Sequence, residues 1–79
     1  MNNKQFSERL NKELDDIGVP EQLDERIDAF SKWIKMPRFK AEALLNGNMV
    51  PDSPVLELLA TEFEVSPDWL LGNTKDRAN

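Results

Sequence analysis

The side chains of this 79-residue chain offer little for catalysis, because the sequence contains neither histidine nor cysteine. General acid–base and nucleophilic catalysis often use those residue types, and thiolate zinc sites require cysteine. The acids Asp15 and Asp16, and the cluster of Asp24, Glu25 and Asp28, lie on predicted helix surfaces without the spacing of a calcium-binding loop. The sequence also has no glycine-rich phosphate loop. We therefore expect a protein that is not an enzyme and that uses no metal and no cofactor.

Positive charge is the chemistry that the sequence does concentrate. The chain has a net charge of −5, yet residues 31–48 carry four bases and one acid, a net charge of +3, which leaves −8 for the rest. The bases are Lys32, Lys35, Arg38 and Lys40. The overall acidity argues against non-specific nucleic-acid binding, which depends on phosphate neutralisation. The local cluster nevertheless makes residues 31–48 the candidate binding segment.

Two predicted helices meet within this segment. The first spans about 24–34, with Asp24 as its N-cap. Its apolar stripe consists of Ile27, Phe30 and Ile34. The second spans 37–46, because Pro37 suits the first helical position and Gly47 suits a left-handed cap. Two helices joined by so short a turn are typical of a helix-turn-helix.

The second helix of this corner has two distinct faces. Ala41, Leu44 and Leu45 recur at helical spacing and are expected to face inward. The residues on or beside the outer face are Arg38, Phe39, Lys40, Glu42, Ala43 and Asn46. In a helix-turn-helix that outer face enters the major groove of DNA. An ordinary surface helix in a small bundle would show the same two faces with its bases merely solvated, so the pattern leaves both interpretations open.

Three further helices are predicted around the corner. One spans about 5–17 and is ended by Gly18, a second follows a cap at Ser53, and a third lies between a cap at Ser66 and Gly72. The first of these is expected to bury Phe6, Leu10, Leu14 and Ile17 and to expose Glu8, Glu13, Asp15 and Asp16. The other two are expected to bury Leu56, Leu59, Ala60, Phe63, Trp69 and Leu70.

Together these elements predict one small all-α domain, a compact bundle of about five short helices. The domain covers residues 1–72, with the helix-turn-helix at about 24–47, and a flexible polar tail follows over 73–79. Trp33 is expected to be a core or half-buried anchor. No apolar run approaches the roughly 20 residues that span a bilayer, and the polar start MNNKQ is unlike a signal peptide. We therefore expect a cytoplasmic protein without a membrane partner.

Three segments carry a resemblance to a known family: FSERLNKELDDIGVP, FSKWIKMPRFKAEALLNG and LELLATEFEVSPDWLLG. From Phe6 to Gly72 the chain resembles the phage-repressor-like helix-turn-helix family of the lambda repressor, Cro and XRE type, and it looks like the DNA-binding domains of CI-type repressors. The resemblance implies a lambda-repressor-like bundle that binds double-stranded DNA as a homodimer. It also implies a role in transcription regulation, as a repressor of phage or mobile-element type.

The resemblance further implies which residues meet DNA. Arg38, Phe39 and Ala43 match positions where the family reads base edges, while Asn46 and Asn48 match positions that meet the DNA backbone. Arg38 suits guanine, and Phe39 suits a thymine methyl group. The predicted DNA-contacting residues are Arg26, Lys35, Pro37, Arg38, Phe39, Lys40, Glu42, Ala43, Asn46 and Asn48.

Several residues depart from the family pattern. Pro37 replaces the small polar residue that caps the recognition helix and touches a phosphate, and Asp52 and Glu57 stand where many relatives carry bases. Lys35 replaces the turn glycine, which predicts a positive φ at a cost of about 1–2 kcal/mol and a lysine aimed at a phosphate. Pro37 at the missing phosphate contact, Phe39 on the outer face and the acidic balance of the chain support an alternative, in which the same fold is a module that binds a protein partner.

Overall fold

Five helices account for the regular structure of the computed structural model, which describes residues 3–77. They are α1 (Asn3–Asp16), α2 (Leu23–Ile34), α3 (Arg38–Asn46), α4 (Ser53–Phe63) and α5 (Pro67–Leu71). The predicted all-α bundle of short helices is confirmed, and the described residues form no strand. Within residues 3–77, no helix combines the length and the apolar character needed to cross a membrane.

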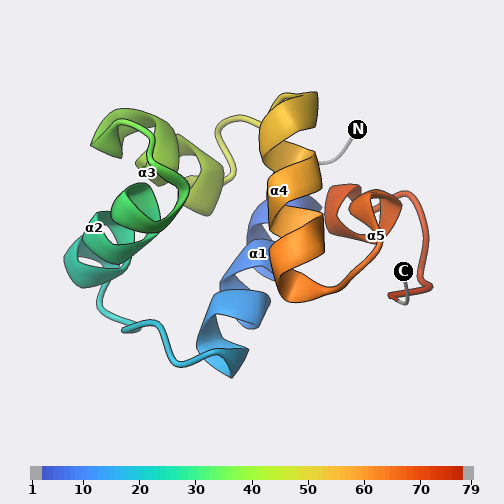
Figure 1. Cartoon of the computed structure of the whole chain (residues 1–79), viewed down its shortest axis with the longest axis horizontal. Helices are drawn as coiled ribbons and strands as arrows, with labels where there is room; N and C mark the ends of the chain where they lie inside the picture. Colours follow the sequence, from blue (N-terminus) through green and yellow to red (C-terminus); the bar gives the residue numbers. More distant parts are fainter. Residues whose placement is uncertain (1–2, 78–79) are drawn as a thin grey trace.

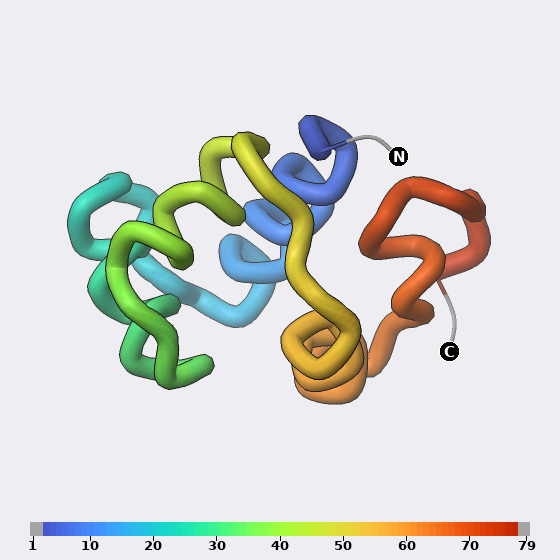
Figure 2. The backbone as a smooth tube through the Cα atoms, turned by 90° about the horizontal axis from the view of Figure 1, so that it is seen from above, coloured from blue at the N-terminus to red at the C-terminus, as the bar shows by residue number. Residues whose placement is uncertain are grey.

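The long N-terminal helix α1 joins the two halves of the bundle. α2 and α3 lie together on one side of the molecule, α5 lies on the other, and α4 stands between them (Figure 1). The view from above shows the same order, with the C-terminal segment beside α5 (Figure 2). α1 packs against both α3 and α5, while α2 packs against α3 and α4 against α5. The position of the α2–α3 corner is therefore set through α1.

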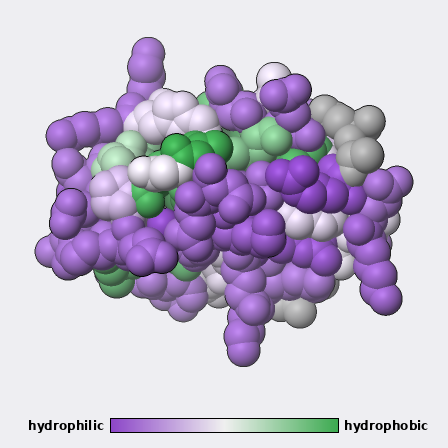
Figure 3. All heavy atoms as spheres, turned by 90° about the horizontal axis from the view of Figure 1, so that it is seen from below, coloured by the Kyte–Doolittle hydropathy of each residue, from purple (hydrophilic) through white to green (hydrophobic). Residues whose placement is uncertain are grey.

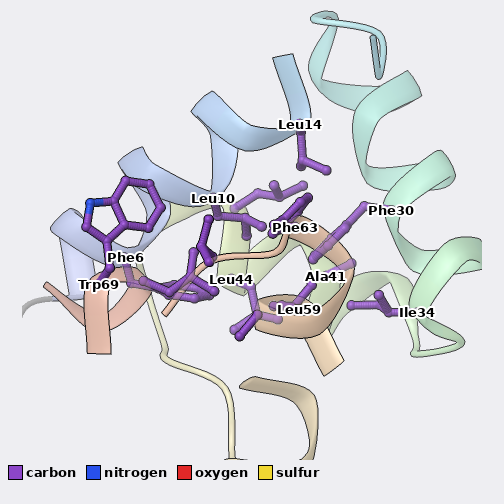
Figure 4. Close-up of a cluster of buried hydrophobic side chains, with 14 of the residues drawn as sticks. Phe6, Leu10, Leu14, Phe30, Ile34, Ala41, Leu44, Leu59, Phe63 and Trp69 are labelled. Atoms are coloured by element: carbon purple, nitrogen blue, oxygen red, sulfur yellow. The ribbon is translucent and has the colours of Figure 1, made fainter. Parts of the chain in front are cut away.

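Apolar side chains from all five helices form one core. In the close-up, Trp69 lies at one end of this cluster, and Phe30 and Ile34 lie at the other (Figure 4). The buried members are Phe6, Leu10, Leu14, Ile27, Phe30, Ile34, Ala41, Leu44, Leu45, Leu59, Ala60, Phe63, Val65, Trp69 and Leu70. Burying a large apolar side chain stabilises a fold by roughly 1.5–3 kcal/mol, so this cluster is the main source of stability. Leu56, which was predicted to face inward, is only partly buried against it.

The C-terminal end of α1 differs from the prediction. The helix stops at Asp16, so Ile17, predicted in the core, lies in the following turn with 57% of its surface exposed. Asp15 and Asp16 face water as predicted, although acids at a helix C-terminus oppose its dipole. Both are compensated by bases: Asp15 pairs with Arg26, and Asp16 pairs with Lys12 at 3.3 Å.

Two helices use a different capping residue from the one predicted. α2 is capped by the Gln22 side chain, which accepts a hydrogen bond at 2.9 Å from the backbone amide three residues on, and Asp24 lies in its first turn. α4 is capped by Asp52, whose carboxylate accepts an amide hydrogen bond at 3.2 Å, and Ser53 is its first residue. In both cases an upstream oxygen satisfies an amide of the first turn. The predicted cap at Ser66 is confirmed.

Residues 73–77, predicted as the start of a flexible tail, fold back against α1. Arg77 pairs with Glu13 at 2.6 Å, and this hydrogen bond raises the pKa of Arg77. Glu13 was predicted to face water; that prediction is wrong, because the residue is only 2% exposed beneath this pair. The guanidinium carbons of Arg9 and Arg77 lie 4.8 and 5.5 Å from the Trp69 ring centroid. The final two residues of the predicted tail lie outside the described part of the chain.

Candidate functional site

The turn between α2 and α3 has the predicted backbone geometry at Lys35 but not at Pro37, which was predicted to be the first residue of the second helix. Lys35 adopts φ 55 and ψ 53, the left-handed conformation, and its amide donates to the carbonyl of Ser31. The amide of Met36 donates to the same carbonyl at 3.0 Å. Pro37 is extended at φ −60 and ψ 148, so it precedes the helix as its N-cap rather than forming its first residue. A left-handed residue followed by an extended proline turns the chain sharply into α3.

α3 buries one face and exposes the other. Ala41, Leu44 and Leu45 are buried, as predicted, and this fixes the rotation of the helix about its axis. At about 100° per residue, the direction opposite to these three is occupied by Phe39 and Ala43. Phe39 is 70% exposed. The exposed members of the predicted contact set are Lys35, Pro37, Arg38, Phe39, Lys40, Glu42, Asn46 and Asn48, while Ala43 is half-buried.

Arg26 does not belong to this exposed surface. The residue is only 5% exposed, and its guanidinium donates to the Asp15 carboxylate and to the Asn11 side-chain oxygen, the latter at 2.9 Å. It also donates to two carbonyls of the α1–α2 connection, at 2.8 and 3.1 Å. Asn11 in turn donates to the carbonyl of Leu45 at 3.1 Å. The predicted phosphate contact is wrong, because this arginine is committed to tying α2, α1 and the end of α3 together.

Two acids of α2 hold the arginine of α3. The Arg38 guanidinium lies 3.3 Å from the Asp28 carboxylate and 3.5 Å from that of Asp24. Asp28 also pairs with Lys32 at 3.0 Å. Lys32 and, more weakly, Arg38 lower the pKa of Asp28 from its usual value. Half of the predicted cations in this segment are therefore neutralised by neighbouring carboxylates.

The two remaining cations border a groove between the turn and the start of α4. Lys35 and Lys40 are exposed and form no ion pair within residues 3–77. The groove has a volume of about 220 Å³. Its walls are Ile34, Lys35, Met36, Pro37, Lys40, Leu44, Met49, Pro51, Asp52 and Val55. The free positive charge of the corner thus lies on the α4 side of α3, and the neutralised charge lies on the α2 side.

Trp33 lies outside the α3 surface, where it joins α2 to α4. Its ring centroid is 5.5 Å from that of Phe63 and 6.3 Å from that of Phe30. Trp33 was predicted to be a core or half-buried anchor; it does pack against these two rings, but it is more exposed than predicted, with 39% of its surface accessible. On the face seen from below, hydrophobic residues appear as a few separate green patches within a mostly polar surface (Figure 3).

Some of these contacts could be anticipated from spacing and others could not. The pair of Lys32 with Asp28 follows the i, i+4 rule for helices. The contacts of Arg38 with Asp24 and Asp28 cross the corner and depend on how α2 and α3 pack. The same holds for Arg26, whose partners lie on α1. No group of three or more acids within residues 3–77 is arranged to hold a metal ion.

The chain matches no protein-family model, no curated protein and no solved structure with which it was compared. The functional assignment of the α2–α3 corner therefore depends on its own geometry, exposure and charge. Three features bear on it: a helix fixed on one face and exposed on the other, a short turn that precedes it, and two unpaired lysines beside it.

Proposed function

We propose that the protein binds double-stranded DNA by placing α3 in the major groove. The observation that carries this proposal is the combination of a buried and an exposed face on α3, directly after a short turn from α2. A helix held in this way can project one row of side chains into a groove about 12 Å wide, while the preceding helix crosses the backbone. The resemblance to phage-type repressors supports the same docking.

The exposed side chains offer suitable chemistry for both parts of a DNA site. Lys35 and Lys40 are free to neutralise phosphates, which supplies affinity that depends on salt. Asn46 can contact the DNA backbone, and Phe39 can contact a thymine methyl group. Arg38 can bind guanine with two hydrogen bonds, for about 1–3 kcal/mol of discrimination, once it leaves its carboxylate partners.

We further propose that two copies bind a two-fold symmetric site and repress transcription. One α3 helix reads only a few base pairs, so pairing two half-sites raises both affinity and specificity. The exposed Leu58 on α4 and the half-buried Val55 and Leu71 are the candidate apolar contacts of such a homodimer.

Fluorescence anisotropy with a labelled mixed-sequence DNA duplex, repeated over a salt series, tests the proposal. We expect binding that weakens as salt rises, and each of Lys35→Gln and Lys40→Gln should reduce the salt slope by about one. Lys12→Gln makes the same charge change on α1, so it is the matched control and should leave the slope unchanged. Absence of binding at low salt, or equal effects of all three variants, contradicts the proposal.

The second candidate function is binding of a protein partner through the same face. The observation that favours it is the 70% exposure of Phe39 beside Pro37, which has no amide hydrogen to offer a phosphate. A module of this kind would bind no duplex DNA at low salt. Its interaction with a partner would be lost in Phe39→Ala and retained in Lys40→Gln, whereas DNA binding requires the lysine.

A further inference from the structure

The carboxylates of Asp24 and Asp28 pair with Arg38, the residue proposed to read a guanine. Both lie on α2 and face the first residue of α3, with oxygen-to-nitrogen distances of 3.5 and 3.3 Å to Arg38. Asp28 additionally holds Lys32 at 3.0 Å, so it neutralises two cations at once. A major-groove helix normally benefits from every cation near its N-terminal end, because phosphates lie close on both sides.

We propose that Asp28, assisted by Asp24, is an internal competitor that restrains Arg38 and lowers the affinity of the protein for non-cognate DNA. This inference rests on the proposed DNA-binding function and deepens it. On DNA, the Arg38 guanidinium exchanges its carboxylate partners for a base edge or a phosphate. The two carboxylates then remain near the DNA backbone, where their charge opposes binding.

The exposure of these groups makes the exchange easy. The Arg38 side chain is 51% exposed and that of Asp28 is 48% exposed, so water screens their attraction. Exposed ion pairs of this kind are weak and exchange with solvent. Arg38 is therefore held in position without being locked. The buried Arg26 differs in this respect, because its side chain is 5% exposed and cannot leave without disturbing three elements.

The competition favours cognate DNA over other sequences. At any duplex, the freed carboxylates repel the phosphates and the lost ion pairs must be replaced. On cognate DNA, Arg38 replaces its lost ion pairs with two hydrogen bonds to a guanine. On other sequences it can replace them only with a phosphate contact. Acids beside the reading residue thus reduce non-specific affinity more than specific affinity. The same competition explains how a chain with a net charge of −5 can bind a specific DNA sequence while binding other sequences weakly.

The test compares Asp28→Asn with Asp16→Asn in the full chain. Both changes remove one negative charge and one i, i+4 pair with a lysine, but Asp16 pairs with Lys12 on α1, away from the corner. With a labelled mixed-sequence duplex, we expect Asp28→Asn to bind about three- to tenfold tighter than the unchanged protein and to steepen the salt slope by up to about one. Asp16→Asn should change the affinity by less than about twofold.

The variant Arg38→Ala shows whether the effect passes through the arginine. In that background, Asp28→Asn still removes a repulsive charge and releases Lys32, but it frees no arginine, so it should give a smaller gain in affinity. Equal affinities of Asp28→Asn and Asp16→Asn, with the unchanged protein binding DNA, overturn the competitor role and leave the proposed function intact. Failure of every variant to bind at low salt overturns both. Circular dichroism verifies that each variant is folded.

Discussion

Replacing Arg26 by alanine should damage the stability of the fold and not its binding surface. All five N–H donors of this guanidinium are used, by the Asp15 carboxylate, by two oxygens of Asn11 and by the carbonyls of Val19 and Pro20. The alanine variant removes all of these hydrogen bonds and opens a space between α1 and α2. Removing one partner of a buried ion pair typically costs 3–5 kcal/mol.

The lower end of that range applies here. Asp15 is about half exposed, so its carboxylate regains water when Arg26 is removed. We therefore expect a loss of about 3 kcal/mol in the free energy of unfolding, which corresponds to a fall of roughly 12–24 °C in Tm for a domain of this size. Arg26→Lys retains the charge but not the fork of donors, and it should lose less than the alanine variant.

Urea denaturation followed by circular dichroism measures this loss, with Arg38→Ala as the matched arginine control. The control removes exposed pairs only, so its free energy of unfolding should fall by less than about 1 kcal/mol. Equal stability of Arg26→Ala and the unchanged protein refutes the structural role of Arg26. If Arg26→Ala keeps its stability but loses DNA binding, the result would support the phosphate contact that the sequence predicts for Arg26.

Three further changes have defined outcomes. Arg77→Ala leaves the buried Glu13 carboxylate without its ion-pair partner, so the free energy of unfolding measured by urea denaturation should fall by about 2 kcal/mol. Unchanged stability would contradict this. Lys35→Gly and Glu64→Gly each remove the backbone strain of a non-glycine residue at positive φ, so each should raise the free energy of unfolding by up to about 1 kcal/mol. Only Lys35→Gly should also weaken DNA binding. Because the hydrogen bond from Lys32 lowers the folded-state pKa of Asp28 below its usual value of 3.8, the stabilisation from this pair is present above pH 3.8 and is lost as the pH falls through the folded-state pKa; an NMR titration in which the Asp28 carboxyl has its midpoint at or above 3.8 refutes this.

The sequence predicts the helices well because their signals are local. Ala41, Leu44 and Leu45 recur at helical spacing and are buried as expected, and Lys35 takes the positive φ that replacing a turn glycine requires. The end of α1 was misplaced because Ile17 continues the apolar spacing beyond the last helical residue. An apolar residue just past a helix end cannot be distinguished from a core residue by periodicity alone.

Polar pairings across elements could not be predicted. Arg26 and Glu13 both look like surface residues on their own helices, and each is buried because a partner distant in the chain satisfies it. The identity of those partners depends on the packing of α1 against α2 and against the C-terminal segment. The carboxylates around Arg38 are a similar case, since its ion pairs cross the corner between two helices. The candidate site was therefore located by sequence, but its charge balance was not.

The most direct measurement is an NMR titration of isotope-labelled protein with a DNA duplex. If α3 enters the major groove, the largest amide shift changes should fall on Phe39, Ala43 and Asn46 and on the turn at Lys35, and they should shrink as salt is added. Changes confined to the α4–α5 side, or no changes at low salt, contradict binding of DNA through α3.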